Sequence, residues 1–182
     1  MRRNSKWLVC MLLCLLTAVM GGCGDRKDIE DSSYILAMGF EKINDKYLVR
    51  YSYGDFDGEK SNSGTKVPSR SITFLADSFA DANKKWGQYQ RKKLNFGHLK
   101  VVIFGNGKKD PAVIRELLSH PQIAKSVFVL ETEKTLREVF AAEEKIPVSF
   151  GEYMVEAVEN SEKISSPKKF TLGRVYMEDE KQ

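Results

Sequence analysis

The chain has 182 residues with 42% apolar and 30% charged side chains, which is ordinary globular composition and excludes a low-complexity or disordered protein. Three of its 29 basic residues lie among the first six positions, so the remaining 26 nearly balance the 25 acidic residues. A nearly neutral body with only short lysine and arginine clusters does not predict nucleic-acid binding.

The first 22 residues have the layout of a secretory signal peptide. They open with three cations, continue with an uncharged apolar run over residues 7–20, and end in two glycines before Cys23. The apolar run is shorter than the ~18–20 residues that span a bilayer comfortably. We therefore predict a lipoprotein signal peptide over residues 1–22, cleavage before Cys23, and lipid on that cysteine.

The residues around the cleavage point resemble the bacterial lipobox, with Met20 in place of the usual leucine. The other two cysteines, Cys10 and Cys14, fall in the leader, so Cys23 has no disulfide partner in the mature chain. An N-palmitoyl group and an S-diacylglycerol on Cys23 would supply enough acyl chains for stable anchoring. The alternatives are an uncleaved anchor helix and plain secretory cleavage that leaves a free cysteine.

After a polar membrane-proximal segment over residues 23–33, the pattern predicts a single domain over residues 34–182. A continuous apolar run over residues 34–40 and an alternating run over residues 47–53 predict two strands of a β-hairpin, with a turn at residues 44–46. The continuity of the first run indicates a strand that is covered on both faces.

The alternating run places three tyrosines on one face of its strand: Tyr47, Tyr51 and Tyr53. A half-buried sheet face is the commoner meaning of such a row, and a ligand platform is the alternative. A loop over residues 54–69 and a short strand over residues 71–75 follow. Ser78 and Asp81 then fit a capping box that opens a helix with one apolar side.

Residues 98–104 predict a central strand that ends at Gly105. Asp110 and Pro111 follow and predict a helix through Leu118. A strand, a glycine loop and a helix suggest a nucleotide site, but the Gly-Lys-Ser/Thr ending of a phosphate loop is missing. Asp110 also stands where a dinucleotide-binding loop needs its third glycine, and it would repel a phosphate at that helix start.

The remainder predicts a strand over residues 126–130, a helix capped by Thr132, a helix capped by Ser149, and a last strand or docking segment over residues 170–177. The order is ββ(β)αβαβααβ. It predicts an α+β (mixed α/β) fold in which helices pack on a mixed β-sheet.

No catalytic or metal-binding set emerges from the sequence. The serine elbow of hydrolases and the His-Glu-x-x-His motif are both missing, and the only histidines, His98 and His120, lie in different contexts. Carboxylates such as Asp55 and Asp57, or Glu143 and Glu144, are interpreted as surface charges. We therefore predict a protein that is not an enzyme and has no cofactor and no metal.

Three stretches carry a more specific pattern. In the first, residues 24–31 follow Cys23 with an Asp-Arg-Lys-x-Ile-x-Asp run. In the second, residues 91–105, Gly97 and His98 lead into a buried strand that ends at Gly105. In the third, residues 117–147, a helix and a Pro-x-Ile step precede a strand, a helix and a final Lys-Ile-Pro.

Together these stretches resemble the Ger(x)C family, the C-subunit lipoproteins of spore nutrient germinant receptors. Gly24 departs from the aromatic residue usual after the cysteine. Family members are longer and have further domains after this one, so the resemblance covers the N-terminal domain. It marks Gly97, His98 and Gly105 as motif residues, for which we expect structural roles.

The resemblance implies a non-catalytic lipoprotein on the outer face of the cytoplasmic membrane, which in a spore is the inner membrane. Its partners would be a polytopic A-type subunit and a transporter-like B-type subunit, and it would be needed for the germination response to nutrients. The alternative is a stand-alone extracytoplasmic solute-binding or sensory lipoprotein, in which the tyrosine face would line a pocket.

Overall fold

The computed structural model describes residues 31–54, 69–107, 109–146, 148–161 and 170–179. Within these ranges, five strands form a mixed sheet in the order β3-β2-β1-β5-β6, and a sixth, β4, also pairs with β1. The strands are β1 (Ser32–Ile43), β2 (Lys46–Gly54), β3 (Ser69–Ala76), β4 (Lys93–Asn95), β5 (Val101–Gly105) and β6 (Phe128–Glu131). The helices are α2 (Phe79–Tyr89), α3 (Pro111–Ser119), α4 (Leu136–Phe140), α5 (Phe150–Glu159) and α6 (Leu172–Asp179), with a short 3₁₀-helix at Glu143–Lys145.

The predicted hairpin is confirmed. β1 and β2 pair antiparallel down to Ile43 and Lys46, so the connecting loop is Asn44-Asp45. Asn44 has a φ of 55°, a left-handed conformation that asparagine tolerates better than most residues. β3 continues the antiparallel half by pairing along the whole of β2. The predicted loop between β2 and β3 lies mostly in residues 55–68, outside the described residues.

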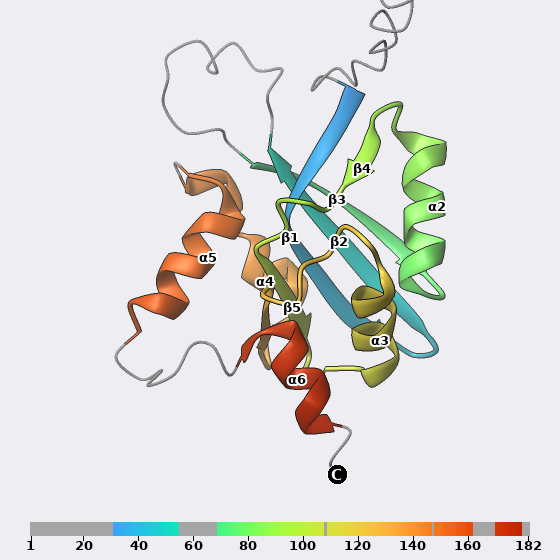
Figure 1. Ribbon diagram of the computed structural model, residues 1–182. Helices are drawn as coiled ribbons and strands as arrows, with labels where there is room; N and C mark the ends of the chain where they lie inside the picture. Colours follow the sequence, from blue (N-terminus) through green and yellow to red (C-terminus); the bar gives the residue numbers. More distant parts are fainter. Residues whose placement is uncertain (1–30, 55–68, 108, 147, 162–169, 180–182) are drawn as a thin grey trace, which may run out of the picture.

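The other half of the sheet is parallel and requires crossovers. β1 pairs parallel with β5, and β5 pairs parallel with β6, so helices must return the chain between these strands. α2 precedes β4 and β5, and α3 joins β5 to β6. Figure 1 shows α2, α3 and α6 on one side of the sheet and α4 and α5 on the other. The sheet is therefore covered on both faces, as expected for apolar strands such as β1 and β5.

Each face of the sheet has its own hydrophobic core. The larger core lies under α2, α3 and α6, where Trp86 is 1% exposed and packs edge-on against Tyr51 with ring centroids 5.6 Å apart. The smaller core lies under α4 and α5, where Phe140 and Phe150 have ring centroids 4.5 Å apart. β1 serves both cores, with Met38 in the larger and Ala37 in the smaller.

The α+β class is confirmed, but three elements differ in detail from the prediction. The strand expected at residue 98 begins at Val101, because Leu99 N–H donates to Phe96 O in a turn. The helix α4 is capped by Thr135, whose side chain and Glu138 form a capping box, and not by Thr132. The last predicted strand is the helix α6; only Thr171 forms a bridge, to Phe128.

Two helical glycines with opposite surroundings provide a test of this packing. An alanine Cβ at Gly151 of α5 would lie 2.4 Å from Leu36 O of β1, whereas a Cβ at Gly87 of α2 would meet nothing within 4 Å. We expect Gly151→Ala to lower the free energy of unfolding by about 1–3 kcal/mol through overpacking. We expect Gly87→Ala to raise it by about 0.5–1 kcal/mol through helix propensity.

Chemical denaturation followed by far-UV circular dichroism measures both values. Equal changes in the free energy of unfolding for the two variants would show that α5 does not approach β1 as closely as described.

Candidate functional site

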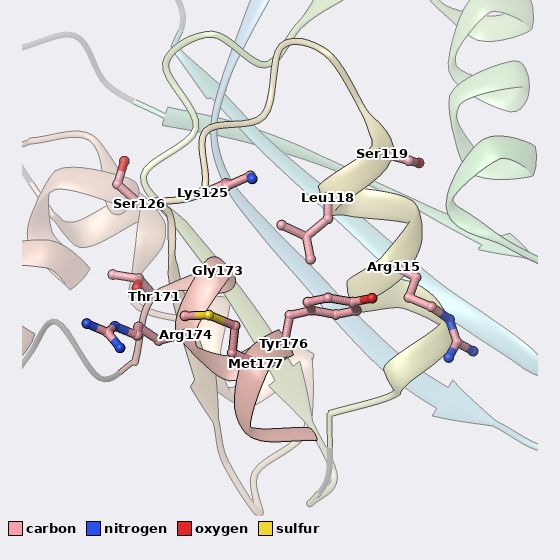
Figure 2. Close-up of a pocket in the computed structure, with 10 residues that line it drawn as sticks. All are labelled: Arg115, Leu118, Ser119, Lys125, Ser126, Thr171, Gly173, Arg174, Tyr176 and Met177. Atoms are coloured by element: carbon pink, nitrogen blue, oxygen red, sulfur yellow. The ribbon is translucent and has the colours of Figure 1, made fainter. Parts of the chain in front are cut away.

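A groove with a volume of about 1050 Å³ lies between α3 and α6 and offers a surface for ligand or partner contact. Its lining comes from these two helices and the segment that precedes β6: Arg115, Leu118, Ser119, Lys125, Ser126, Thr171, Gly173, Arg174, Tyr176 and Met177. Figure 2 shows Leu118 and Tyr176 pointing toward one another across the groove, with Arg115 and Arg174 directed outward on either side.

α6 is held in place by backbone contacts at its first turn. Leu172 N–H donates to Val127 O at 2.8 Å, and Gly173 N–H donates to Lys125 O at 3.0 Å. A side chain at position 173 would press on the Lys125 Cβ at 3.2 Å, so a glycine permits this close approach. Leu172 and Val175 are buried, and the next residues, Tyr176 and Met177, are left to line the groove.

The composition of the groove indicates what it can bind. Its centre is apolar, and Met177 remains 46% exposed there. The cations stand at its edges, and none of the described lining residues is a carboxylate. Such a surface is suited to apolar side chains of a protein segment more than to a small polar nutrient, which needs convergent hydrogen-bonding groups.

The residues singled out from the sequence do not gather in one place. Cys23 lies outside the described residues, so its lipidation stays a prediction. Gly97 and His98 occupy the turn before β5; the Gly97 N–H donates to Asn95 Oδ1 at 3.0 Å. The exposed His98 ring packs edge-on against Tyr34, with centroids 5.6 Å apart. These contacts are consistent with structural roles.

Gly105 ends β5 at a crowded point. A Cβ there would lie 3.2 Å from both Leu136 N and Lys134 O. The buried Glu41 carboxylate lies beside it and accepts hydrogen bonds from Leu136 N–H at 2.6 Å and from Asn106 Nδ2 at 2.9 Å. Glu41 thus caps the first amide of α4, that of Leu136, from strand β1, a role that the sequence pattern did not predict.

The tyrosine row is a half-buried sheet face, as its commoner interpretation predicted. Tyr51 is fully buried, and its hydroxyl donates to Asn83 Oδ1 of α2 at 2.7 Å. Tyr47 and Tyr53 are partly buried against the same core. The alternative of a tyrosine-lined ligand platform does not fit, because α2 covers the middle of the row.

Tyr47 links the hairpin end to the start of α3. Its hydroxyl donates to Asp110 Oδ2 at 2.7 Å, and Lys42 Nζ lies 3.1 Å from the same oxygen. Burial, followed by the bond to the Asp110 carboxylate, raises the pKa of Tyr47 to about 12. Burial opposes ionisation of Asp110, but hydrogen bonds from Tyr47, the Ala112 N–H and Lys42 outweigh it and hold the pKa of Asp110 below its ordinary value.

The prediction that Glu143 is a surface charge is wrong. It is 4% exposed, it accepts a hydrogen bond from the Ser52 hydroxyl, and its Oε2 lies 3.5 Å from Arg50 Nη2. Arg50 and Ser52 alternate with the tyrosines along β2 and therefore face the other side of the sheet. This burial depends on tertiary contact between β2 and the 3₁₀-helix, which no local pattern indicates.

The described ranges contain neither a metal-binding cluster nor a membrane-spanning helix. No group of three or more histidine, cysteine, aspartate or glutamate side chains there is arranged to hold a metal ion. None of the helices in the same ranges has the length and apolar character needed to cross a bilayer.

Comparison with known proteins gives a consistent result. A family model described as the spore germination protein N-terminal domain matches residues 25–178. YfkR of Bacillus subtilis (strain 168), named as a spore germination protein, is 24% identical over 141 residues, which are 71% of this chain and 36% of that protein. Spore germination protein KC of the same organism is 24% identical over 104 residues, 54% of this chain and 26% of that protein.

The matched part of this chain therefore spans roughly a third or less of each relative, 36% and 26% of their lengths. No solved structure matches the chain.

The Tyr47 contact can be tested by pH. Because the pKa of Tyr47 is raised in the folded state, the Tyr47 hydroxyl contributes fully to the free energy of unfolding below pH 10. That contribution is lost as the pH rises through 12. We expect Tyr47→Phe to lower the free energy of unfolding by about 1 kcal/mol at neutral pH. The difference from wild type should shrink between pH 10 and 12, as the wild-type phenol ionises.

Tyr89→Phe is the matched control, because that ring is 76% exposed and should show no difference at any pH. A pH-independent effect of Tyr47→Phe would contradict the hydrogen bond to Asp110.

Proposed function

Because the chain belongs to the family of spore germination protein N-terminal domains, we propose that it is a membrane-anchored lipoprotein subunit of a spore nutrient germinant receptor. Membership confirms the resemblance to the Ger(x)C family that the three sequence stretches indicated. The observation that carries the proposal is the family match over residues 25–178, which begins two residues after Cys23.

The anchor is the first component of the proposal. The signal-peptide layout of residues 1–22 and the lipobox-like step before Cys23 support cleavage and lipidation at that cysteine. A lipidated Cys23 would hold the domain at the outer face of the cytoplasmic membrane, the inner membrane of the spore. Eight residues separate Cys23 from the start of β1 at Ser32. The domain would therefore stay within roughly 30 Å of its anchor, given about 3.3–3.6 Å per extended residue.

The second component is a non-catalytic role beside polytopic A-type and B-type subunits. The absence of a nucleophile–base arrangement in the sequence supports this role, as does the apolar character of the groove. We propose that a polytopic subunit places apolar side chains in the groove between α3 and α6. The domain would then act by contact within an assembly, and nutrient recognition need not occur on it.

Lipidation can be tested with three cysteine variants. We expect Cys23→Ala to abolish incorporation of a labelled fatty acid, because that residue carries the predicted thioether and amide links. Cys10→Ala and Cys14→Ala are the controls and should be labelled like wild type, since both lie in the leader. Mass spectrometry separates the alternatives: an uncleaved anchor retains residues 1–22, and plain secretory cleavage removes them without adding lipid.

The same cysteine variants also test the proposed role as a germinant receptor subunit. For this, spores that carry each variant are scored for germination with a panel of nutrients. A slower response of Cys23→Ala alone supports a tethered receptor subunit, and unchanged germination of spores that lack the whole chain would refute it.

The groove can be tested by cross-linking, because the chain has no cysteine after Cys23. We expect Met177→Cys in α6 to form a cross-link with a polytopic receptor subunit in spore membranes when a short bifunctional thiol reagent is added. Tyr153→Cys in α5 is the matched control, since the two side chains are 46% and 45% exposed. Cross-linking at position 153 and not at 177 would contradict the groove as the contact surface and would place the partner on the α5 side of the sheet.

A further inference from the structure

A second cavity, of about 640 Å³, lies on the α4 side of the sheet and is lined by three arginines. Its walls come from β2, β3, α4 and the 3₁₀-helix: Arg50, Tyr53, Ser69, Arg70, Ser71, Arg137, Phe140, Ala141 and Glu143. One carboxylate, Glu143, accompanies the guanidinium groups of Arg50 and Arg137, so the lining carries a net positive charge. Arg70 pairs with Tyr53, whose ring packs against Trp86, so its side chain starts from the α2 side of the sheet. Such a concentration of arginine in one cavity is not explained by the groove or by the proposed anchor.

Arg50 forms the base of this cavity and is held in a fixed position. Its Nη2 donates to Ser71 Oγ at 2.5 Å and lies 3.5 Å from Glu143 Oε2. Its guanidinium stacks over the Phe140 ring, 4.8 Å from the ring centre. A guanidinium braced by a carboxylate, a hydroxyl and a ring loses little freedom when it binds a further group, which favours affinity.

Arg50 still has hydrogen-bonding capacity. Its Nε is buried and has no acceptor among the described residues. A buried donor without an acceptor is uncommon in folded proteins and indicates that the acceptor comes from outside these residues. Arg50 therefore combines a charge that Glu143 only partly offsets with a donor that the described protein leaves unused.

The cavity edge adds further donors. Arg137 on α4 is exposed and makes no ion pair with another described residue. The hydroxyls of Ser69 and Ser71 accept hydrogen bonds from Phe150 N–H and from Arg50, which leaves the hydrogen of each hydroxyl free to be donated. Arginine forks and serine hydroxyls are the donors that phosphate oxygens fit best.

We propose that this cavity binds a phosphate group, with Arg50 and Arg137 as its cationic donors. A phosphate could come from an anionic lipid headgroup or from a free phosphate ion, and the position of the cavity favours the lipid. β3 begins at Ser69, which pairs with Gly54 at the end of β2, and Figure 1 shows this end of the sheet beside the start of β1. The preference for a lipid rests on the proposed anchoring at Cys23, because Cys23 precedes β1 in the sequence and β1 starts at that end of the sheet. The proposed phosphate site itself does not depend on the anchor.

The test is a calorimetric titration of the full chain in an uncharged detergent. Short-chain phosphatidylglycerol and inorganic phosphate are the two probes, and short-chain phosphatidylcholine controls for binding through the acyl chains. We expect Arg137→Gln to weaken binding of the effective probe about tenfold, the usual effect of removing one charge-assisted hydrogen bond. Arg91→Gln, an exposed arginine just after α2 that lines neither the groove nor the cavity, is the matched control and should bind like wild type.

Each outcome decides a separate question. Binding of phosphatidylglycerol and not of phosphate, weakened by Arg137→Gln, supports the site with a lipid as its source. Binding of inorganic phosphate with the same loss supports the site with free phosphate as its source. Binding of neither probe, or equal binding by wild type and Arg137→Gln, overturns the proposal.

The result is independent of fatty-acid labelling at Cys23. An unlabelled chain that still binds phosphate would refute the anchor and leave the cavity in place.

Discussion

The pairing of β1 on both of its edges is the constraint on which the rest of the structure depends. β1 pairs antiparallel with β2 on one side and parallel with β4 and β5 on the other. A bulge between Ile35 and Ala37 adds one residue to the strand, so Ile35 and Met38 both face the larger core while Ala37 faces the smaller. The carbonyl of Leu36, at the bulge, accepts the Lys100 N–H at 3.0 Å and lies where a Cβ on Gly151 would have to go.

The two faces of the sheet differ in chemistry because β2 alternates. Its tyrosines turn toward α2, where Trp86 completes an aromatic core, and Arg50 and Ser52 turn toward the 3₁₀-helix. In the Arg50–Glu143 pair the carboxylate is buried and the Arg50 side chain is 24% exposed. Burying such a carboxylate is costly, and an apolar pair would serve packing as well. The position of the pair at the base of a cavity that Arg137 also lines suggests that the charges are retained for binding.

Local patterns predicted the elements that depend on local chemistry. The hairpin, the Ser78 and Asp110 helix starts and the buried strand before Gly105 follow from alternation, capping and apolar runs. The pattern of residues 170–177 was ambiguous, because a short run of branched and aromatic residues around Gly173 suits a strand as well as a helix. Leu172 and Val175 pack into the larger core, and this tertiary contact favours the helix over the strand. The prediction for Glu143 was wrong and the role of Glu41 was not predicted for the same reason: the Ser52 and Leu136 partners are 91 and 95 residues away, so the sequence near each glutamate contains no signal.

The separation of the two surfaces is consistent with a tethered domain that makes two contacts at once. The groove lies between helices that cover one face of the sheet, and the arginine cavity lies over the other face. A single lipid anchor leaves a domain free to rotate about its linker. With Cys23 lipidated as proposed, a second, weaker contact with the headgroup layer would restrict that rotation, because the linker would keep the cavity at a high effective concentration near the membrane. Restricted in this way, the domain would present the α3–α6 groove in a limited set of directions, and a membrane-embedded partner would meet it at a lower entropic cost.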